Sequence, residues 1–327
     1  MKILFLKPID KSTSHVNDFL LDSLLIGLRA KFGNDVIDFP AATYIYKNQI
    51  KKPSELWGGG FTLYDLLEDN GKIDRSDIKN KIQTNFFDII ICGAIRGENL
   101  FYNEIINSKS KIAFIDSYDD PFIDEKKIRQ GLYFKRELYE AKHNVLPISY
   151  AIPKEKIAKE IKLFPSNVLS PLAPGNLKTY IYTNEKEYFK MYQDSLFSIT
   201  TQKTGWDCLR HYEILASGSL PFFLNLENCP SLTCSTLPKR EIKKVFSKYN
   251  FVINYYNPFK YLKKRYRNYD SFLKFLKNCF KKKLNSEELI IKYPDLNETR
   301  NFMLEYTKKE LTSEKLCDYV LKNLLKS

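Results

Sequence analysis

The stretch from residue 201 to residue 223, TQKTGWDCLRHYEILASGSLPFF, constrains the fold of this chain more than any other. The small polar and apolar residues that precede it, Ser195–Thr201, predict a strand. Helical spacing of apolar residues predicts a helix over residues 206–217, and Gly218 is suited to end it. Leu220–Leu224 then predicts another strand. A strand, a turn, a helix and a strand in succession are typical of a parallel α/β sheet.

The turn before the predicted helix contains Lys203, Thr204 and Gly205. The first turn of a helix has unpaired N–H groups and the positive end of the helix dipole, so we expect phosphates to rest on the amide end of a helix beginning at Trp206. A glycine in such a turn lets a ligand approach the backbone closely.

Arg210 and Glu213 are three residues apart and share one face of the predicted helix. The forked guanidinium can hold a diphosphate, and the carboxylate can accept hydrogen bonds from two sugar hydroxyls. The pair is therefore suited to a sugar nucleotide, although an ordinary ion pair on a helix surface has the same spacing.

This stretch resembles the donor-site signature of GT-B glycosyltransferases, most closely that of the exostosin-like and CgeB-like group. The shared pattern, Arg-x-x-Glu-x-hydrophobic-Ala-x-Gly, runs here from Arg210 through Glu213 and Ala216 to Gly218. In that family the glutamate binds the nucleotide ribose and the arginine lies near the phosphates. The resemblance is close over residues 188–238. It implies an α/β fold with two Rossmann-like domains facing a central cleft, and transfer of a sugar from a nucleoside-diphosphate sugar.

The chain departs from the family pattern at one position. Many retaining members carry a second glutamate eight residues before the ribose-binding one, where this chain has Gly205. The stereochemical course, retaining or inverting, is therefore left open. The resemblance also implies that neither a metal nor a cofactor is needed besides the donor, because helix ends and basic residues offset the diphosphate charge in this fold.

The first half of the chain predicts a second α/β unit. Apolar runs predict strands at residues 2–6, 35–39, 87–92, 111–115 and 145–152, and helical spacing predicts a helix at 17–32. A proline-rich passage places the domain boundary near residues 155–166. We expect an acceptor-side domain over 1–157 and a nucleotide-sugar domain over 158–308. Residues 309–327 would form a helix that crosses back to the first domain, as in GT-B proteins.

Asp116 and Asp119 are the candidate catalytic residues. They follow the strand predicted at 111–115, and ligands of open α/β sheets bind beyond the carboxyl ends of strands. An inverting transfer needs a general base because an acceptor hydroxyl is a poor nucleophile. Asp120, which precedes Pro121, fits a turn better. The same carboxylates could instead bind a divalent cation.

Two further segments resemble parts of the same family. Lys135 and Arg136 lie in a Phe-Lys-Arg-Glu segment, which implies that they neutralise phosphate across the cleft; the alternative is a basic helix face. Three glycines at 58–60 precede Phe61 and Thr62 and resemble a loop that faces the cleft; the alternative is a plain turn. A short helix is predicted after this loop, at residues 63–68.

The formal charge of +13 allows several partners. It suits an anionic donor, an acidic glycan or glycolipid acceptor, contact with an anionic membrane surface, or simply a lysine-rich surface. Residues 260–267, KYLKKRYR, interleave aromatic and basic side chains. They leave open a rival function, a basic nucleic-acid-binding protein on a Rossmann-like scaffold or a glycosyltransferase acting on nucleic acid, although nucleic acid is the less favoured partner.

The cysteine pattern bears on location. Six scattered cysteines without a Cys-x-x-Cys motif are typical of reduced thiols in a cytoplasmic protein and argue against a zinc site. The start of the chain does not predict a secretory signal. We expect a cytoplasmic protein, peripheral at most to the inner face of the membrane, with a bacterial surface polysaccharide as the acceptor class by analogy with the family.

Overall fold

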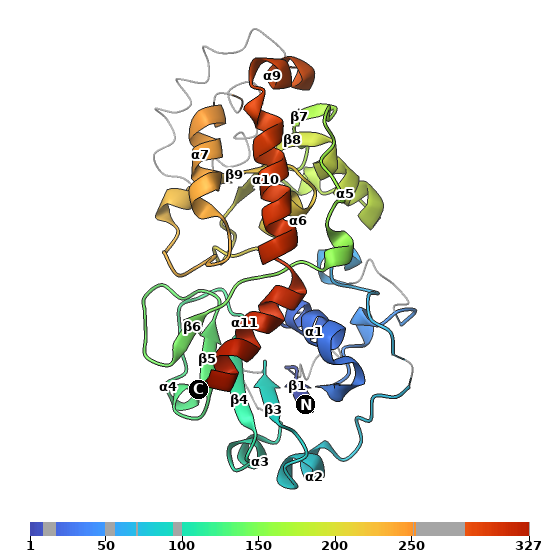
Figure 1. Cartoon of the computed structure of the whole chain (residues 1–327), viewed down its shortest axis with the longest axis vertical. Coiled ribbons are helices and arrows are strands. Elements are labelled where there is room, and N and C mark those ends of the chain that lie inside the picture. Colours follow the sequence, from blue (N-terminus) through green and yellow to red (C-terminus); the bar gives the residue numbers. More distant parts are fainter. Residues whose placement is uncertain are drawn as a thin grey trace.

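The computed structural model describes residues 1–8, 18–49, 56–69, 71–93, 100–250, 252 and 285–326. Within these residues the chain is an α/β structure with a six-stranded parallel sheet and a three-stranded parallel sheet. The two sheets lie toward opposite ends of the long axis of the molecule (Figure 1). The α/β class predicted from the sequence is confirmed at this level.

The six-stranded sheet is built from the first half of the chain. Its strand order is β2-β1-β3-β4-β5-β6, and every described pairing is parallel. The strands are β1 (Ile3–Leu6), β2 (Val36–Phe39), β3 (Ile89–Cys92), β4 (Lys111–Asp116), β5 (Leu132–Lys135) and β6 (Val145–Pro147). The apolar runs that predicted β1 to β4 are buried, as expected for a parallel sheet covered by helices. The sequence did not predict β5, so the alternative of a basic helix face at Lys135 is wrong.

The helices of this half are short except for α1. They are α1 (Phe19–Phe32), α2 (Ile78–Gln83), α3 (Tyr102–Ile106) and α4 (Glu125–Ile128). Asp18 caps α1 by accepting hydrogen bonds from the N–H groups of Leu20 and Leu21, and Gly33 ends it at a φ of 54°. The helix predicted at 63–68 is wrong, because Asp65 has a φ of 55° and a right-handed helix cannot pass through it.

The three-stranded sheet belongs to the second half and has the order β7-β8-β9. Its strands are β7 (Asn167–Leu169), β8 (Ser195–Thr201) and β9 (Leu220–Leu224). The helices that follow β7 are α5 (Glu185–Gln193), α6 (Leu209–Ala216), α7 (Lys239–Tyr249), α9 (Ser286–Lys292), α10 (Asp295–Glu310) and α11 (Ser313–Lys326). The strand predictions at β8 and β9 are confirmed to the residue. Helix α6 is shorter than predicted.

Among the described residues, the buried apolar side chains form two large clusters. The first draws on residues 3–151, on Leu209 and on α11, and the second on residues 152–311. The chain crosses from one cluster to the other near Ile152 and again near Leu311, and these two crossing points lie side by side. The N–H of Ile152 donates to the carbonyl of Leu311 at 2.9 Å, and the N–H of Ser313 donates to the carbonyl of Ile152 at 3.0 Å. Helix α10 therefore packs in the second half, whereas α11 packs on α1 and β4 in the first (Figure 1).

Candidate functional site

A cavity of about 600 Å³ is lined by residues of both halves. Its size is within the usual range for small-molecule sites. Several residues predicted to form the site line it: Asp119, Lys203, Thr204, Gly205, Arg210 and Glu213. Residues of the glycine loop, Gly58, Gly59 and Phe61, line it from the opposite half. The cavity therefore brings together segments that lie far apart in the sequence.

Arg210 is a buried cation in the wall of this cavity. Its side chain is 7% exposed, and Nη2 donates to the hydroxyl of Tyr180 at 2.8 Å. Among the described residues, Nη1 has no hydrogen-bond partner, and no carboxylate forms an ion pair with the guanidinium. Burying a charge without a counter-ion is costly. Arg210 is thus suited to an anionic ligand in the cavity.

Glu213 lies one turn further along α6 and accepts two hydroxyls. Thr62 Oγ1 donates to Oε1 at 2.5 Å, and the hydroxyl of Tyr188 donates to Oε2 at 2.6 Å. Burial raises the pKa of Glu213, while these hydrogen bonds and the charge of Arg210 act in the opposite direction. Each carboxylate oxygen holds one hydroxyl, which is the arrangement that two neighbouring sugar hydroxyls would reproduce.

The glycine loop places Thr62 against the second half. The glycines at 58–60 have φ values between 70° and 75°, and Thr62 itself has a φ of 71°. A β-branched residue in this left-handed region is strained. Its N–H donates to Oε1 of Glu185 at 2.6 Å, and its hydroxyl donates to Glu213. Hydrogen bonds to two carboxylates of the other half thus hold Thr62 in an unfavourable backbone conformation.

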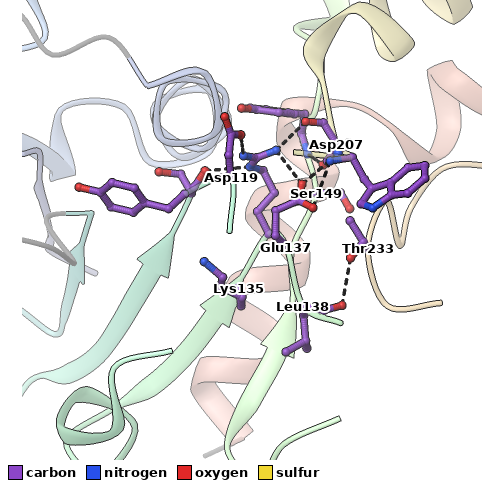
Figure 2. A network of polar contacts seen from close by, with 12 residues as sticks. Asp119, Lys135, Glu137, Leu138, Ser149, Asp207 and Thr233 are labelled. Carbon is purple, nitrogen blue, oxygen red and sulfur yellow. Dashed lines mark hydrogen bonds and ion pairs between the residues drawn. The ribbon is translucent and has the colours of Figure 1, made fainter. Parts of the chain in front are cut away.

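The start of α6 differs from the prediction. The helix begins at Leu209 and not at Trp206. The N–H groups of Trp206 and Asp207 donate to the Glu137 carboxylate at 3.1 Å and 3.0 Å, so this segment is a loop bound to the first half (Figure 2). The amides expected to hold phosphate are therefore occupied by the protein's own side chain. At the true first turn of α6, no side chain caps the helix at Cys208.

The position of Gly205 has no room for a larger side chain, because two carboxylates of the protein lie against it. A Cβ added there would lie 2.6 Å from Oε1 of Glu137 and 2.9 Å from Oδ1 of Asp119. The close approach that the glycine permits is thus made by these two side chains. A glutamate at this position, as in many retaining members of the resembled family, would have no room in this arrangement.

Arg136 organises the contact between Glu137 and the second half. Its Nη1 donates to Glu137 Oε1 at 3.0 Å and to the carbonyl of Asp207 at 2.5 Å, and Nη2 forms an ion pair with Asp119 (Figure 2). Its Nε donates to the carbonyl of Ser117 at 2.8 Å. Arg136 is buried and does not line the cavity, whereas Asp119 is half-exposed and does. Arg136 therefore joins the two halves and holds Asp119 at the cavity wall.

Asp116 and Lys135 form a separate pair beneath this network. Both side chains are 0% exposed, and Lys135 Nζ lies 2.9 Å from Asp116 Oδ1. The hydroxyl of Tyr133 donates to Asp116 Oδ2 at 2.5 Å. Lys135 stands apart from the network in Figure 2, and neither residue lines the cavity. Of the two candidate catalytic aspartates, the structure places Asp119 at the cavity and Asp116 in the core of the first half.

No site role was predicted for several residues that the structure brings to this region: Thr62, Glu137, Tyr180, Tyr188 and Asp207. Glu137 and Asp207 matter because they tie the loop before α6 to the first half. The hydroxyls of Tyr180 and Tyr188 bind Arg210 and Glu213. Thr62 and Glu137 lie in segments that resemble the family, but the resemblance assigns them no contact, and no local motif marks the other three. The abundance of tyrosine, 22 in the chain, was the available signal.

His211 is buried next to this loop and should make stability depend on pH. Its Nε2–H donates to the carbonyl of Trp206 at 2.9 Å, and Thr200 Oγ1 donates to Nδ1 at 2.8 Å. Burial lowers the pKa of His211 from 6.5 to about 3. The unfolded chain takes up a proton below pH 6.5 that the folded chain does not. We therefore expect the free energy of unfolding to fall as the pH drops from about 6.5 to about 3.

Urea unfolding at a series of pH values would measure this dependence. The His211→Gln variant should lose less stability than wild type over the same pH window, whatever its stability at pH 7. Parallel pH curves for the two proteins would show that His211 does not carry the effect.

Three observations bear on the predictions about metals, membranes and nucleic acid. In the described parts of the chain, no group of three or more His, Cys, Asp or Glu side chains is arranged to hold a metal ion. No helix in those parts combines the length and apolar character needed to cross a bilayer. The basic segment 260–267 lies outside the described residues.

The resemblance to GT-B glycosyltransferases rests on the motif residues of this chain. Comparison with models of protein families gives no match, and comparison with curated proteins gives no significant one.

Proposed function

We propose that the chain is a GT-B glycosyltransferase that takes a sugar from a nucleoside-diphosphate sugar bound in the cavity between its halves. The observation that carries this proposal is the buried Arg210, whose Nη1 has no partner among the described residues, one turn before Glu213. An anion beside a pair of hydroxyls satisfies both side chains. Diphosphate next to ribose has that chemistry.

The leaving diphosphate would be stabilised by Arg210 and by the uncapped first turn of α6. A guanidinium and backbone amides that face developing negative charge lower the barrier for its departure. Thr204 and Lys203 line the same cavity and add polar groups on this side. In this proposal the first-turn amides of α6 hold the diphosphate. The amides of Trp206 and Asp207, which were expected to do so, bind Glu137 instead.

Asp119 is the residue best placed to act on the acceptor. Its carboxylate lies at the cavity wall, in the half opposite Arg210, and the ion pair with Arg136 fixes its position. A general base must reach the acceptor hydroxyl within hydrogen-bonding distance. Asp119 lies at the cavity wall, where an acceptor hydroxyl would come within reach, whereas Asp116 is fully buried and does not line the cavity. The acceptor class we propose is a glycan or glycolipid of a bacterial surface polysaccharide.

A binding panel tests the donor site. Wild-type protein should show a higher melting temperature with at least one of UDP, GDP, ADP or CMP, since a ligand that binds only the folded state stabilises it. The matching nucleotide sugar should then be hydrolysed or transferred, and Asp119→Asn should slow that step more than it weakens donor binding. Salt-steep binding of nucleic acid, with no nucleotide affinity, would overturn the proposal and favour the rival function.

Thr62 gives a prediction specific to the ribose position. A ribose hydroxyl must displace the Thr62 hydroxyl from Glu213, so Thr62→Val removes a competitor and keeps the side-chain shape. A net hydrogen bond contributes about 0.5–1.5 kcal/mol, so the nucleotide affinity should rise by about twofold to twelvefold. Calorimetric titration would measure it, with the exposed Thr84→Val as control. An unchanged affinity would indicate that the ligand does not reach Glu213 Oε1.

A further inference from the structure

Two cysteines lie near each other in the loop that follows the short helix η7 (Leu226–Asn228). The Sγ of Cys229 lies 3.6 Å from the carbonyl oxygen of Pro230 and 3.8 Å from that of Thr233, the residue before Cys234. Both cysteines are free, and each thiol lies close enough to affect the pKa of the other. The loop thus folds back so that two thiols five positions apart lie near each other.

The two thiols differ in access and in acidity. Cys229 is partly exposed and Cys234 is buried. The neighbouring Cys234 thiol and the nearby Lys239 ammonium lower the pKa of Cys229, whereas burial raises that of Cys234. Lys239 Nζ is held in place by the carbonyls of Thr233 at 2.7 Å and Ser231 at 2.8 Å. Cys229 is therefore the nucleophile that an oxidant reaches first.

This loop also joins the two halves of the molecule. Thr233 Oγ1 donates to the carbonyl of Leu138 at 3.0 Å, and the N–H of Ser235 donates to Ser149 Oγ at 2.9 Å (Figure 2). Cys234 also lies close enough to Asp207 that its thiol lowers the pKa of that carboxyl, against the effect of burial. A change in the loop is thus transmitted directly to the contact between the halves.

We propose that Cys229 and Cys234 form a reversible disulfide when the protein meets a peroxide, and that the disulfide loosens the contact of this loop with the first half. The Cys229 thiolate attacks the peroxide, forming a sulfenic acid and releasing hydroxide, which takes up a proton to become water. The Cys234 sulfur then attacks the sulfenic sulfur, the S–S bond forms and a second water leaves. Two thiols are oxidised and one peroxide is reduced. The buried Asp207 carboxylate loses its neighbouring thiol.

Peptide mass spectrometry of the full-length protein tests the first part. After hydrogen peroxide and alkylation of the remaining thiols, the tryptic peptide 211–239, which contains both cysteines, should be unalkylated and lighter by two hydrogen atoms. Dithiothreitol should reverse this. Cys234→Ser should stop at a sulfenic acid on Cys229 that dimedone traps, and the control Cys208→Ser should form the disulfide normally. Full alkylation of this peptide in oxidised wild type would overturn the proposal.

Hydrogen–deuterium exchange tests the second part and does not depend on any bound nucleotide. Oxidised wild type should exchange faster than reduced wild type in segments 138–150 and 229–236, and Cys229→Ser should show no difference with peroxide. A disulfide that forms without faster exchange in these segments would contradict the loosened contact. A disulfide between other cysteines would contradict the assigned pair.

Discussion

Replacing Arg210 with glutamine should weaken the binding of nucleoside diphosphates by about 100-fold. The change removes charge-assisted hydrogen bonds to the diphosphate, each worth about 1.5 kcal/mol or more, and tenfold in affinity corresponds to about 1.4 kcal/mol. Two such bonds lost from a buried site give the stated factor. Calorimetric titration with the nucleotide that stabilises wild type would measure it. Arg240→Gln, a change at an exposed arginine on α7, should leave the affinity unaltered.

The stability of the Arg210→Gln variant separates a ligand-binding role from a structural one. Arg210 is buried beside a tyrosine and has no carboxylate partner among the described residues, so its charge costs free energy in the ligand-free protein. We therefore expect the melting temperature of the variant to equal or exceed that of wild type. Sites built for binding commonly show this trade between stability and function. A lower melting temperature with unchanged nucleotide affinity would mean that Arg210 serves the fold alone.

Replacing Asp116 with alanine should lower the free energy of unfolding by about 3–5 kcal/mol. The change leaves the Lys135 ammonium without the carboxylate that pairs with it, in a place where both side chains are 0% exposed. It also removes the acceptor of the Tyr133 hydroxyl. Urea denaturation followed by circular dichroism would measure the loss as a lower midpoint. The exposed Glu140→Ala is the matched control and should change stability little.

A double variant distinguishes a lost charge pair from lost packing. Asp116→Leu combined with Lys135→Met removes both charges and fills much of the space, so it should recover a large part of the stability lost in Asp116→Ala. Donor binding should be unaffected in the folded double variant, because neither residue lines the cavity. An Asp116→Ala protein that kept full stability but lost sugar transfer would return Asp116 to a catalytic role.

Predictions from the sequence succeeded where the pattern and the structure are both local. The apolar run at β9 and the mixed small polar and apolar segment at β8 predicted these strands with the observed limits, because both are short segments whose residues suit a buried parallel strand. Helix α5 played no part in the prediction of the site, but in the structure it carries Tyr188, whose hydroxyl donates to Glu213. The spacing of Arg210 and Glu213 predicted that they share one face of a helix, and in the structure both lie on α6 and line the same cavity.

Predictions failed where a distant group decides the local structure. Trp206 and Asp207 have helical spacing with α6, but their N–H groups bind Glu137, which is about 70 residues away in the sequence. Lys135 was expected to face phosphate and instead forms a buried pair with Asp116, because β5 lies beside β4 in the sheet. Neither partner could be inferred from residue types near the helix or the strand.

The sequence by itself determined the α/β class, most of the strands and a helix face that carries a cation and a carboxylate. Periodicity and apolar runs are short-range properties, so they can be read without knowing the fold. Only the tertiary structure decided that the Thr62 hydroxyl donates to the Glu213 carboxylate and that Glu137 binds the loop before α6. It also decided that Nη1 of Arg210 has no hydrogen-bond partner among the described residues. Each buried polar group must find a partner, and which partner it finds depends on how distant segments pack.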